Sequence, residues 1–264
     1  MPLPPRLARL YGRLRIPLKP RRPYVISNFV TTLDGVVSLN EKGHASGGDI
    51  SGFSAQDRAV MGLLRAVVDV IVVGSGTLAV DRRHVWTAER IYPPFANDYR
   101  RLRRSLGKDA TPLMVVVSGG GKLDLSLPLF ASGEMRSLIV TSVAGAKRLR
   151  KQEVPEFVEI RTARGGNAIK ARDILDQVRR VNPGKLILVE GGPRLLGEFF
   201  AAGLLDEQFL TLAPQVAGRE EGDRRLSLVM GRIFAPRAPL FGRLTDLRRG
   251  GSHLFLRYAF TEVR

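Results

Sequence analysis

A glycine pair between two apolar segments constrains this chain more than any other feature. The apolar run Leu186–Val189 leads into Glu190-Gly191-Gly192-Pro193-Arg194, and the segment 195–200 that follows reads as a helix. This order predicts a buried strand, a glycine turn and a helix that begins at the proline. Such a helix presents unpaired backbone N–H groups, and glycines let a phosphate approach them closely. A plain strand-to-helix turn is the alternative, and this segment alone leaves both interpretations open.

A second glycine turn earlier in the chain favours the ligand-binding interpretation. The strand Val70–Val73 is followed by Gly74-Ser75-Gly76-Thr77. Together with Ala79, these glycines match the spacing of the Rossmann dinucleotide fingerprint. However, no sustained helical stripe of apolar residues follows, and the strand lies well inside the chain. The sequence therefore predicts a phosphate or ribose contact here without a Rossmann fold.

Length and composition are those of an ordinary α/β protein. The chain has 264 residues, of which 44% are hydrophobic, and no apolar run approaches the roughly 18 residues that a membrane span needs. It contains no cysteine, which excludes disulfides and thiolate metal sites. Its three histidines show no metal-binding spacing, so we expect no metal site. The N-terminus shows no apolar signal segment, so we expect a cytoplasmic location and no membrane partner.

The net charge of +17 raises the question of a nucleic-acid partner. Clustered arginines and lysines neutralise phosphates and release counterions. Here the basic residues are spread along the whole chain and are not interleaved with aromatic residues. We therefore expect most of them to be solvated and some to attract anionic small molecules. A basic binding protein for nucleic acids or anions stays the alternative from another functional class.

Alternating strand and helix patterns predict one domain over residues 23–264, preceded by a basic, proline-punctuated arm at 1–22. The predicted strands are Tyr24–Thr31, Val70–Val73, Leu113–Val117, Leu138–Thr141, Val158–Ile160, Leu186–Val189 and Phe209–Ala213. The predicted helices cover Ser54–Val68, about 169–181, a basic piece near Asp98–Leu106 and the segment from Leu195. Residues 40–52 read as a loop and the rest of 80–111 as irregular. The tail Arg243–Glu262 predicts an antiparallel hairpin that turns at Arg249–Ser252.

Three motifs, in this order, resemble the reductase domain of bacterial riboflavin biosynthesis. They are the segment Asn28–Gly35, then Arg65 ahead of Val73–Thr77, and finally Val189–Gly197. The resemblance implies the dihydrofolate reductase-like fold: an α/β domain whose mixed, mainly parallel sheet is flanked by helices and closed by an antiparallel C-terminal hairpin. It also implies NADPH as cofactor, a homodimer, and reduction of the ribose of a phosphoribosylaminouracil to a ribityl chain.

The resemblance also implies roles for individual residues. The positions that match cofactor contacts are Val30, Thr31, Thr32, Gly74, Ser75, Gly76, Thr77, Gly191, Gly192, Pro193, Arg194 and Leu195. Ser51, Arg65 and Asp81 match substrate-facing positions, and Asp34 and Glu190 are the candidate catalytic carboxylates.

The physical roles of these residues each have a structural alternative. Arg65 can hold a substrate phosphate with two parallel hydrogen bonds, or it can simply complement a helix dipole. Asp34 can orient the substrate or help to deliver a proton, or it can be only a turn residue before Gly35. Asp81 can face the substrate or accept hydrogen bonds from its neighbours. Hydride transfer is the cofactor's chemistry, so the protein mainly orients the reactants.

The substrate itself is left open by the sequence. The stretch Asp81-Arg82-Arg83 departs from the acidic pair and proline that the family carries there, and this stretch reaches the substrate in the family. Reduction of dihydrofolate or another pterin-like substrate is therefore the alternative within the reductase class. No motif of a zinc deaminase is present, so the resemblance implies a reductase without that activity.

Overall fold

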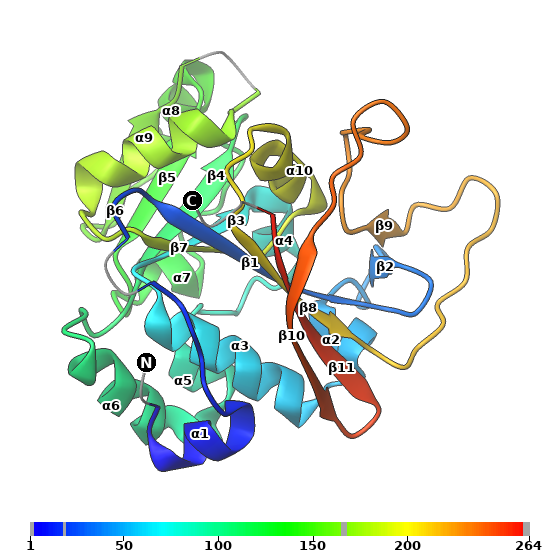
Figure 1. Ribbon diagram of the computed structural model, residues 1–264. Helices are drawn as coiled ribbons and strands as arrows, with labels where there is room; N and C mark the ends of the chain where they lie inside the picture. The colour runs from blue at the N-terminus through cyan, green and yellow to red at the C-terminus, as the bar shows by residue number, and fades with distance from the viewer. Residues whose placement is uncertain (1–2, 18–19, 165–167, 261–264) are drawn as a thin grey trace.

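A nine-stranded mixed sheet runs through the centre of the computed structural model, which describes residues 3–17, 20–164 and 168–260 (Figure 1). The strand order is β10-β11-β8-β1-β7-β3-β4-β5-β6. All neighbours from β8 to β6 are parallel, while β11 runs antiparallel to β8 and β10 antiparallel to β11. The predicted mixed, mainly parallel sheet with an antiparallel C-terminal hairpin is thus confirmed.

The elements have the following bounds. The strands are β1 (Tyr24–Thr31), β2 (Val36–Ser38), β3 (Val70–Gly74), β4 (Leu113–Ser118), β5 (Ser137–Thr141), β6 (Val158–Thr162), β7 (Leu186–Val189), β8 (Glu207–Leu212), β9 (Leu226–Ser227), β10 (Arg243–Gly250) and β11 (His253–Ala259). The helices are α1 (Pro5–Tyr11), α2 (Gly47–Ser51), α3 (Ala55–Val67), α4 (Ser75–Val80), α5 (Ala88–Ile91), the 3-10 helix η1 (Pro93–Phe95), α6 (Ala96–Ser105), α7 (Pro128–Ala131), α8 (Val143–Leu149), α9 (Ala171–Val181) and α10 (Pro193–Ala201). None of the helices in these described ranges is both long enough and apolar enough to span a membrane.

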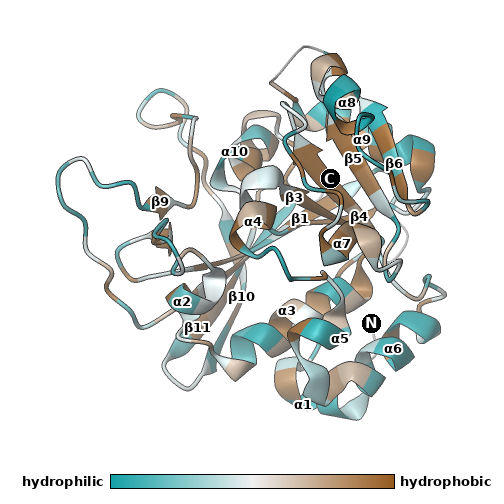
Figure 2. Ribbon diagram, turned by 180° about the vertical axis from the view of Figure 1, so that it is seen from behind, coloured by the Kyte–Doolittle hydropathy of each residue, from teal (hydrophilic) through white to brown (hydrophobic). Residues whose placement is uncertain are grey.

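The central strands are apolar on both faces because helices cover both sides of the sheet. Every residue of β7 is buried, as parallel strands between two helical layers require. One core cluster joins the sheet to α3 and α6, and the other joins it to α9 and α10. Figure 2 shows the hydrophobic residues concentrated on the strands between these layers.

Most predicted elements agree with the structure, and two regions differ. The strand Tyr24–Thr31 and the helix α3, whose N-cap is Ser54, are confirmed. The predicted loop 40–52 contains α2, and the irregular region 80–111 contains α5 and η1 in addition to the predicted basic helix. The hairpin turns where it was expected, while its predicted residues 261–262 lie outside the described ranges.

The N-terminal segment packs against the main core. Leu7 and Tyr11 of α1 and Leu14 after it are buried in the cluster that contains α3. The guanidinium of Arg248 lies over the ring of Tyr11, 4.6 Å from its centroid. The basic, proline-punctuated pattern of this segment did not predict a helix, and the domain boundary at residue 22 stays a prediction.

The topology brings both glycine turns to one place. Strand β7 lies between β1 and β3 in the sheet, and all three are parallel. Their carboxyl ends therefore meet at the same edge, which is where open α/β sheets bind their ligands.

Candidate active site

The two predicted glycine turns touch each other. The N–H of Gly74 donates to the carbonyl of Gly191 at 3.3 Å. A Cβ on Gly191 would lie only 2.6 Å from the side chain of Thr77, so the packing leaves no room for a larger residue. Gly192 has a φ of +84°, a conformation that favours glycine. Glycine is therefore required at positions 191 and 192 for packing and backbone geometry.

Helices α4 and α10 both begin at this contact, and their first N–H groups have no side-chain cap. Uncapped N–H groups carry the positive end of the helix dipole. A Cβ built on Gly76, in the first turn of α4, would meet no atom within 4 Å. The turns thus form a cradle with free donors and open space.

This cradle forms one wall of a cavity of about 920 Å³. Other parts of its lining come from α2, the start of α3 and the segment 226–231. The predicted site residues that line it are Val30, Ser51, Arg65, Gly74, Ser75, Gly76, Thr77, Asp81, Glu190, Gly191, Gly192, Pro193, Arg194 and Leu195. Three predicted residues, Thr31, Thr32 and Asp34, are not part of its lining.

Glu190 and Arg65 form a buried ion pair in the wall of this cavity. The Nε of Arg65 donates to Oε2 of Glu190 at 2.8 Å, and each side chain is only 3% exposed. The Nη1 of Arg65 lies 2.8 Å from Nε2 of His84 and also donates to the carbonyl of Thr87. Burial and the charge of Arg65 lower the pKa of His84 to about 3. His84 is therefore neutral near pH 7 and accepts a hydrogen bond from Arg65.

The second oxygen of Glu190 is buried without a hydrogen bond of ordinary geometry. Burial raises the pKa of Glu190, while Arg65 and the nearby Asn28 side chain lower it in part. Because an unpaired buried oxygen costs free energy, a ligand donor in the cavity would satisfy it.

A second buried carboxylate, Asp57, lies in the same cavity and was missed by sequence reasoning. Burial raises the pKa of Asp57, and the neighbouring Thr211, His253 and Arg58 lower it in part. Its charge also raises the pKa of Glu190, and both residues line this cavity. In the sequence, Asp57 reads as an acidic residue in the first turn of a helix. That pattern is common for structural reasons, so it carries no functional signal by itself.

Asp34 lies in an exposed loop and links that loop to the one that contains Ala217 and Gly218. Its carboxylate accepts from the Thr32 hydroxyl at 2.6 Å, from Ala217 N at 3.0 Å and from Gly218 N at 2.8 Å. These hydrogen bonds lower the pKa of Asp34 to about 2. Thr32 in turn accepts from the N–H of Val36. The structure therefore gives Asp34 a structural role, both in its own turn and as a link to a second loop.

The remaining predicted substrate residues differ in their exposure. Ser51 is buried, and its carbonyl lies 2.9 Å from Nε2 of His253. Asp81 is half exposed, and its carboxylate is 3.7 Å from Nδ1 of His84. Arg58 was not predicted, yet it lines the cavity and is exposed. An exposed guanidinium in the lining is better placed for an anionic ligand than Arg65, which is buried and whose Nε and Nη1 are already bonded.

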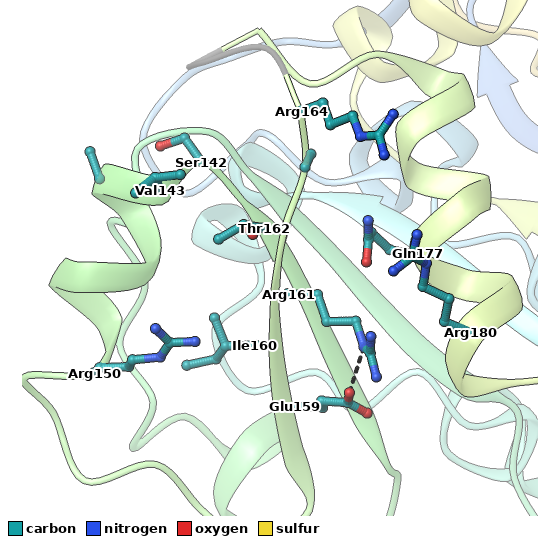
Figure 3. Close-up of a pocket in the computed structure, with 12 residues that line it drawn as sticks. Ser142, Val143, Arg150, Glu159, Ile160, Arg161, Thr162, Arg164, Gln177 and Arg180 are labelled. Carbon is teal, nitrogen blue, oxygen red and sulfur yellow. Dashed lines mark hydrogen bonds and ion pairs between the residues drawn. The ribbon is translucent and has the colours of Figure 1, made fainter.

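A second cavity, of about 720 Å³, lies beside the edge strand β6 between α8 and α9 (Figure 3). Its lining includes Arg150, Arg164 and Arg180, and Glu159 pairs with Arg161 at 2.5 Å. These charged side chains are exposed or half-buried. The cavity contains no predicted site residue, so the cavity beside the glycine turns is the candidate active site.

Comparisons with known proteins identify the family of this chain. The family model of the RibD C-terminal domain matches residues 23–229. A curated 2,5-diamino-6-ribosylamino-4(3H)-pyrimidinone 5′-phosphate reductase from Archaeoglobus fulgidus is 30% identical over 200 residues, which cover 75% of this chain and 83% of that protein. The riboflavin biosynthesis protein RibD from Aquifex aeolicus is 23% identical over 197 residues, 75% of this chain but 48% of its own length.

A solved structure shows the same fold along almost the whole chain. The pyrimidine reductase-like protein from Corynebacterium diphtheriae superposes with a TM-score of 0.71 at 21% identity, covering 97% of this chain and 98% of that one.

Proposed function

The chain belongs to the RibD C-terminal domain family, and from this we propose that it is an NADPH-dependent reductase of a phosphorylated ribosylaminopyrimidine in riboflavin biosynthesis. One observation carries the proposal: a single cavity is lined both by the two glycine turns and by two buried carboxylates. The helices that follow these turns have no side-chain cap. The turns suit a dinucleotide, and the carboxylates suit a heteroaromatic ring that carries N–H and amino donors.

The cradle fits the phosphates of NADPH. The free N–H groups at the start of α10 are donors, Gly192 adds no side chain, and Gly76 leaves open space beside them. Arg194 is exposed at the same helix start and adds positive charge. When bound, NADPH supplies the hydride. The protein's task is to hold the substrate ribose toward it and to exclude water.

The reaction converts a ribosylamine into a ribitylamine. The C1′ carbon of the ribose gains a hydride, the bond from C1′ to the ring oxygen breaks, and that oxygen gains a proton. A carboxyl group near the ring oxygen can serve as the general acid that supplies this proton. Glu190 lines the cavity and burial raises its pKa, so it is the candidate for this role.

Asp57 favours a 2-aminopyrimidinone over a uracil as substrate. A 2-amino group and the neighbouring ring N–H offer two parallel donors, which match the two oxygens of a carboxylate. A uracil offers an oxygen acceptor in place of the amino group, and this oxygen would face a carboxylate oxygen. The substrate in the name of the Archaeoglobus relative carries the 2-amino group. Among phosphoribosylaminopyrimidines we therefore place the diamino compound before the uracil.

The proposal is tested by NADPH oxidation with three substrates side by side: the diaminopyrimidinone, the corresponding uracil and dihydrofolate. We expect turnover of the phosphorylated pyrimidines, fastest with the 2-amino compound. Dihydrofolate also carries a 2-amino-4-oxo ring, so the carboxylates alone do not exclude it. Turnover of dihydrofolate alone would contradict the riboflavin-pathway assignment and support the pterin alternative.

Two further expectations belong to the same proposal. We place the protein in the cytoplasm and expect it to act as a homodimer. The alternative of a basic binding protein predicts salt-dependent DNA affinity without NADPH binding. Quenching of protein fluorescence by NADPH at moderate salt, without DNA affinity, would favour the reductase.

A further inference from the structure

Phe53 has an unusual backbone conformation for a residue in the lining of the candidate active site. Apart from glycines, only Asn40 and Phe53 among the residues that the structure describes have a positive φ, which is 55° at each of them. Asparagine adopts this left-handed conformation readily, whereas a bulky side chain such as phenylalanine adopts it at a cost in free energy. Backbone strain of this kind is concentrated at ligand-binding and catalytic sites.

The side chain of Phe53 adds a second cost, because it is 62% exposed. Removing apolar surface from water stabilises a protein, and the folded chain leaves most of this side chain accessible. A single exposed apolar residue needs no explanation on an open surface. Phe53, however, lines the same cavity as Asp57 and Glu190, so a ligand bound to these carboxylates can cover it.

Contacts with α2 hold the ring of Phe53 in place. The N–H of Phe53 donates to the carbonyl of Gly48 at 2.9 Å, which closes the turn after α2. A Cβ on Gly48 would lie only 2.8 Å from Cε1 of Phe53, so the ring packs against the backbone of this helix. The preceding residue, Gly52, is also left-handed, with a φ of +59°, and glycine adopts this conformation without strain. The turn alone therefore does not account for a phenylalanine at position 53.

The position of Phe53 favours a contact with the substrate over one with the cofactor. The next residue, Ser54, is the N-cap of α3, and its hydroxyl accepts a hydrogen bond from the N–H of Asp57 at 3.3 Å. Phe53 thus adjoins the helical turn whose carboxylate is proposed above to bind the ring N–H and amino groups. The cradle proposed for the NADPH phosphates lies at the starts of α4 and α10 instead. A planar ring held at its edge by Asp57 leaves its faces free, and an aromatic side chain can stack on one of them.

We propose that Phe53 binds the substrate by stacking on its heteroaromatic ring, and that this contact accounts for the strained backbone at position 53. The proposal rests on the reductase function proposed above and adds a residue that recognises the flat face of the substrate. Asp57 recognises the hydrogen-bonding edge of the same ring. Together the two residues select planar heteroaromatic substrates whose edge carries hydrogen-bond donors.

The experiment compares Phe53→Ala, Phe53→Gly and Phe53→Tyr. Isothermal titration calorimetry with the diaminopyrimidinone substrate, in the presence of NADP⁺ so that no hydride is available, gives the dissociation constant of the substrate. We expect this constant to rise about tenfold in the alanine and glycine variants, because the stacking contact is lost, and to stay near the wild-type value in the tyrosine variant. Only glycine also relieves the backbone, so Tm of the glycine variant should exceed that of the alanine variant by about 2–4 °C.

The matched control is Phe157→Ala. Phe157 is 44% exposed, and its ring also packs against a glycine, since a Cβ on Gly133 would lie 2.9 Å from it. It is not part of the lining of the candidate active site. We expect wild-type substrate binding in this control, and unchanged NADPH affinity by fluorescence titration in the control and in all three Phe53 variants.

Circular dichroism checks that each variant is folded, and Phe53→Leu, which keeps an apolar side chain without the flat ring, replaces any variant that is not. Wild-type substrate affinity in the folded variants without the ring would overturn the stacking contact and leave the reductase proposal untouched. Loss of NADPH affinity without loss of substrate affinity would also overturn it, because the ring would then cover the cofactor. Substrate binding that depends on Phe53 in a wild type that oxidises no NADPH would instead contradict the reductase function and support the contact.

Discussion

Asp57 is the residue whose chemistry most affects the choice of substrate. Asp57→Asn keeps the size of the side chain but replaces one acceptor oxygen by an amino donor. We expect kcat/KM to fall about 10- to 100-fold with the 2-amino substrate, since a hydrogen bond to a charged group is lost. With the uracil we expect a smaller loss or a gain, because the new N–H can face the uracil oxygen. Equal losses of kcat/KM on both substrates would show that Asp57 does not distinguish the 2-amino group from the uracil oxygen.

Asp34 should affect stability at low pH more than turnover. Its folded pKa of about 2 lies below its ordinary value of 3.8, so its contribution is fully present above pH 4 and is lost as the pH falls through 2. Asp34→Asn removes this contribution. We therefore expect the variant to turn over at nearly the wild-type rate, with a free energy of unfolding that depends less on pH between 4 and 2. Loss of most turnover at neutral pH would restore Asp34 as a catalytic candidate.

Arg58 and Arg65 can be separated by a phosphorylated substrate and its dephosphorylated analogue. Arg58 is exposed in the lining, so Arg58→Ala should raise KM for the phosphorylated substrate about tenfold and leave the analogue nearly unchanged. Arg65 is buried against Glu190, so Arg65→Ala should affect both substrates alike and cost about 3–5 kcal/mol of stability. If Arg65→Ala raised KM only for the phosphorylated substrate, Arg65 would be the residue that binds the phosphate.

At the scale of single elements, the start of α4 offers a direct test of the cofactor cradle. Gly76 has an ordinary backbone conformation and open space around it, so Gly76→Val causes no strain in the protein alone. We expect a folded protein, because valine suits a helix better than glycine, with NADPH affinity lowered roughly tenfold or more.

The matched control is Gly203→Ala at the end of α10. Gly203 has a φ of +62° and also has open space, so alanine there should cost about 1 kcal/mol of stability. Fluorescence titration should show unchanged NADPH affinity in this control. Wild-type affinity in Gly76→Val would place the cofactor elsewhere.

The sequence predicts elements well where one physical pattern dominates. The strands β3 and β7 are apolar runs that end in glycine turns, and both strands are confirmed. The short helix α2 was missed because its sequence is rich in glycine. It is held by a capping box in which Ser46 and Asp49 bond reciprocally. The short strands β2 and β9 pair although they lie far apart in the chain, and no local sequence pattern predicts this pairing.

The residues of the candidate site were also predictable only where a single sequence pattern identified them. Glu190 and the glycine turns lie at the ends of strands, so topology alone brings them together. Asp57 and Asp34 were harder to interpret, because aspartate is common at helix starts, in turns and in catalytic sites. Only the burial of the side chain distinguishes these roles. Asp57 is 4% exposed, while Asp34 is exposed and hydrogen-bonded to a second loop.

At the scale of the whole molecule, cofactor binding should raise the thermal stability. The cradle joins β3, β7, α4 and α10, so a bound ligand stabilises the folded state against the unfolded chain. At a free concentration of about 100 times Kd, the gain is about 2.7 kcal/mol, which raises Tm by about 5–10 °C. Differential scanning fluorimetry with NADPH checks this value. No shift at saturating NADPH in the wild type would contradict the cofactor assignment.

The position of β1 in the sheet also determines when the chain can fold during synthesis. β1 is the first strand made, yet both of its neighbours, β7 and β8, come from the last third of the chain. Until residues 186–212 leave the ribosome, the apolar strand Tyr24–Thr31 has no partner on either edge. Such long-range parallel pairing is slow and leaves strand edges exposed. Nascent chains that end before β7 should therefore depend on chaperones, whatever the stability of the finished protein.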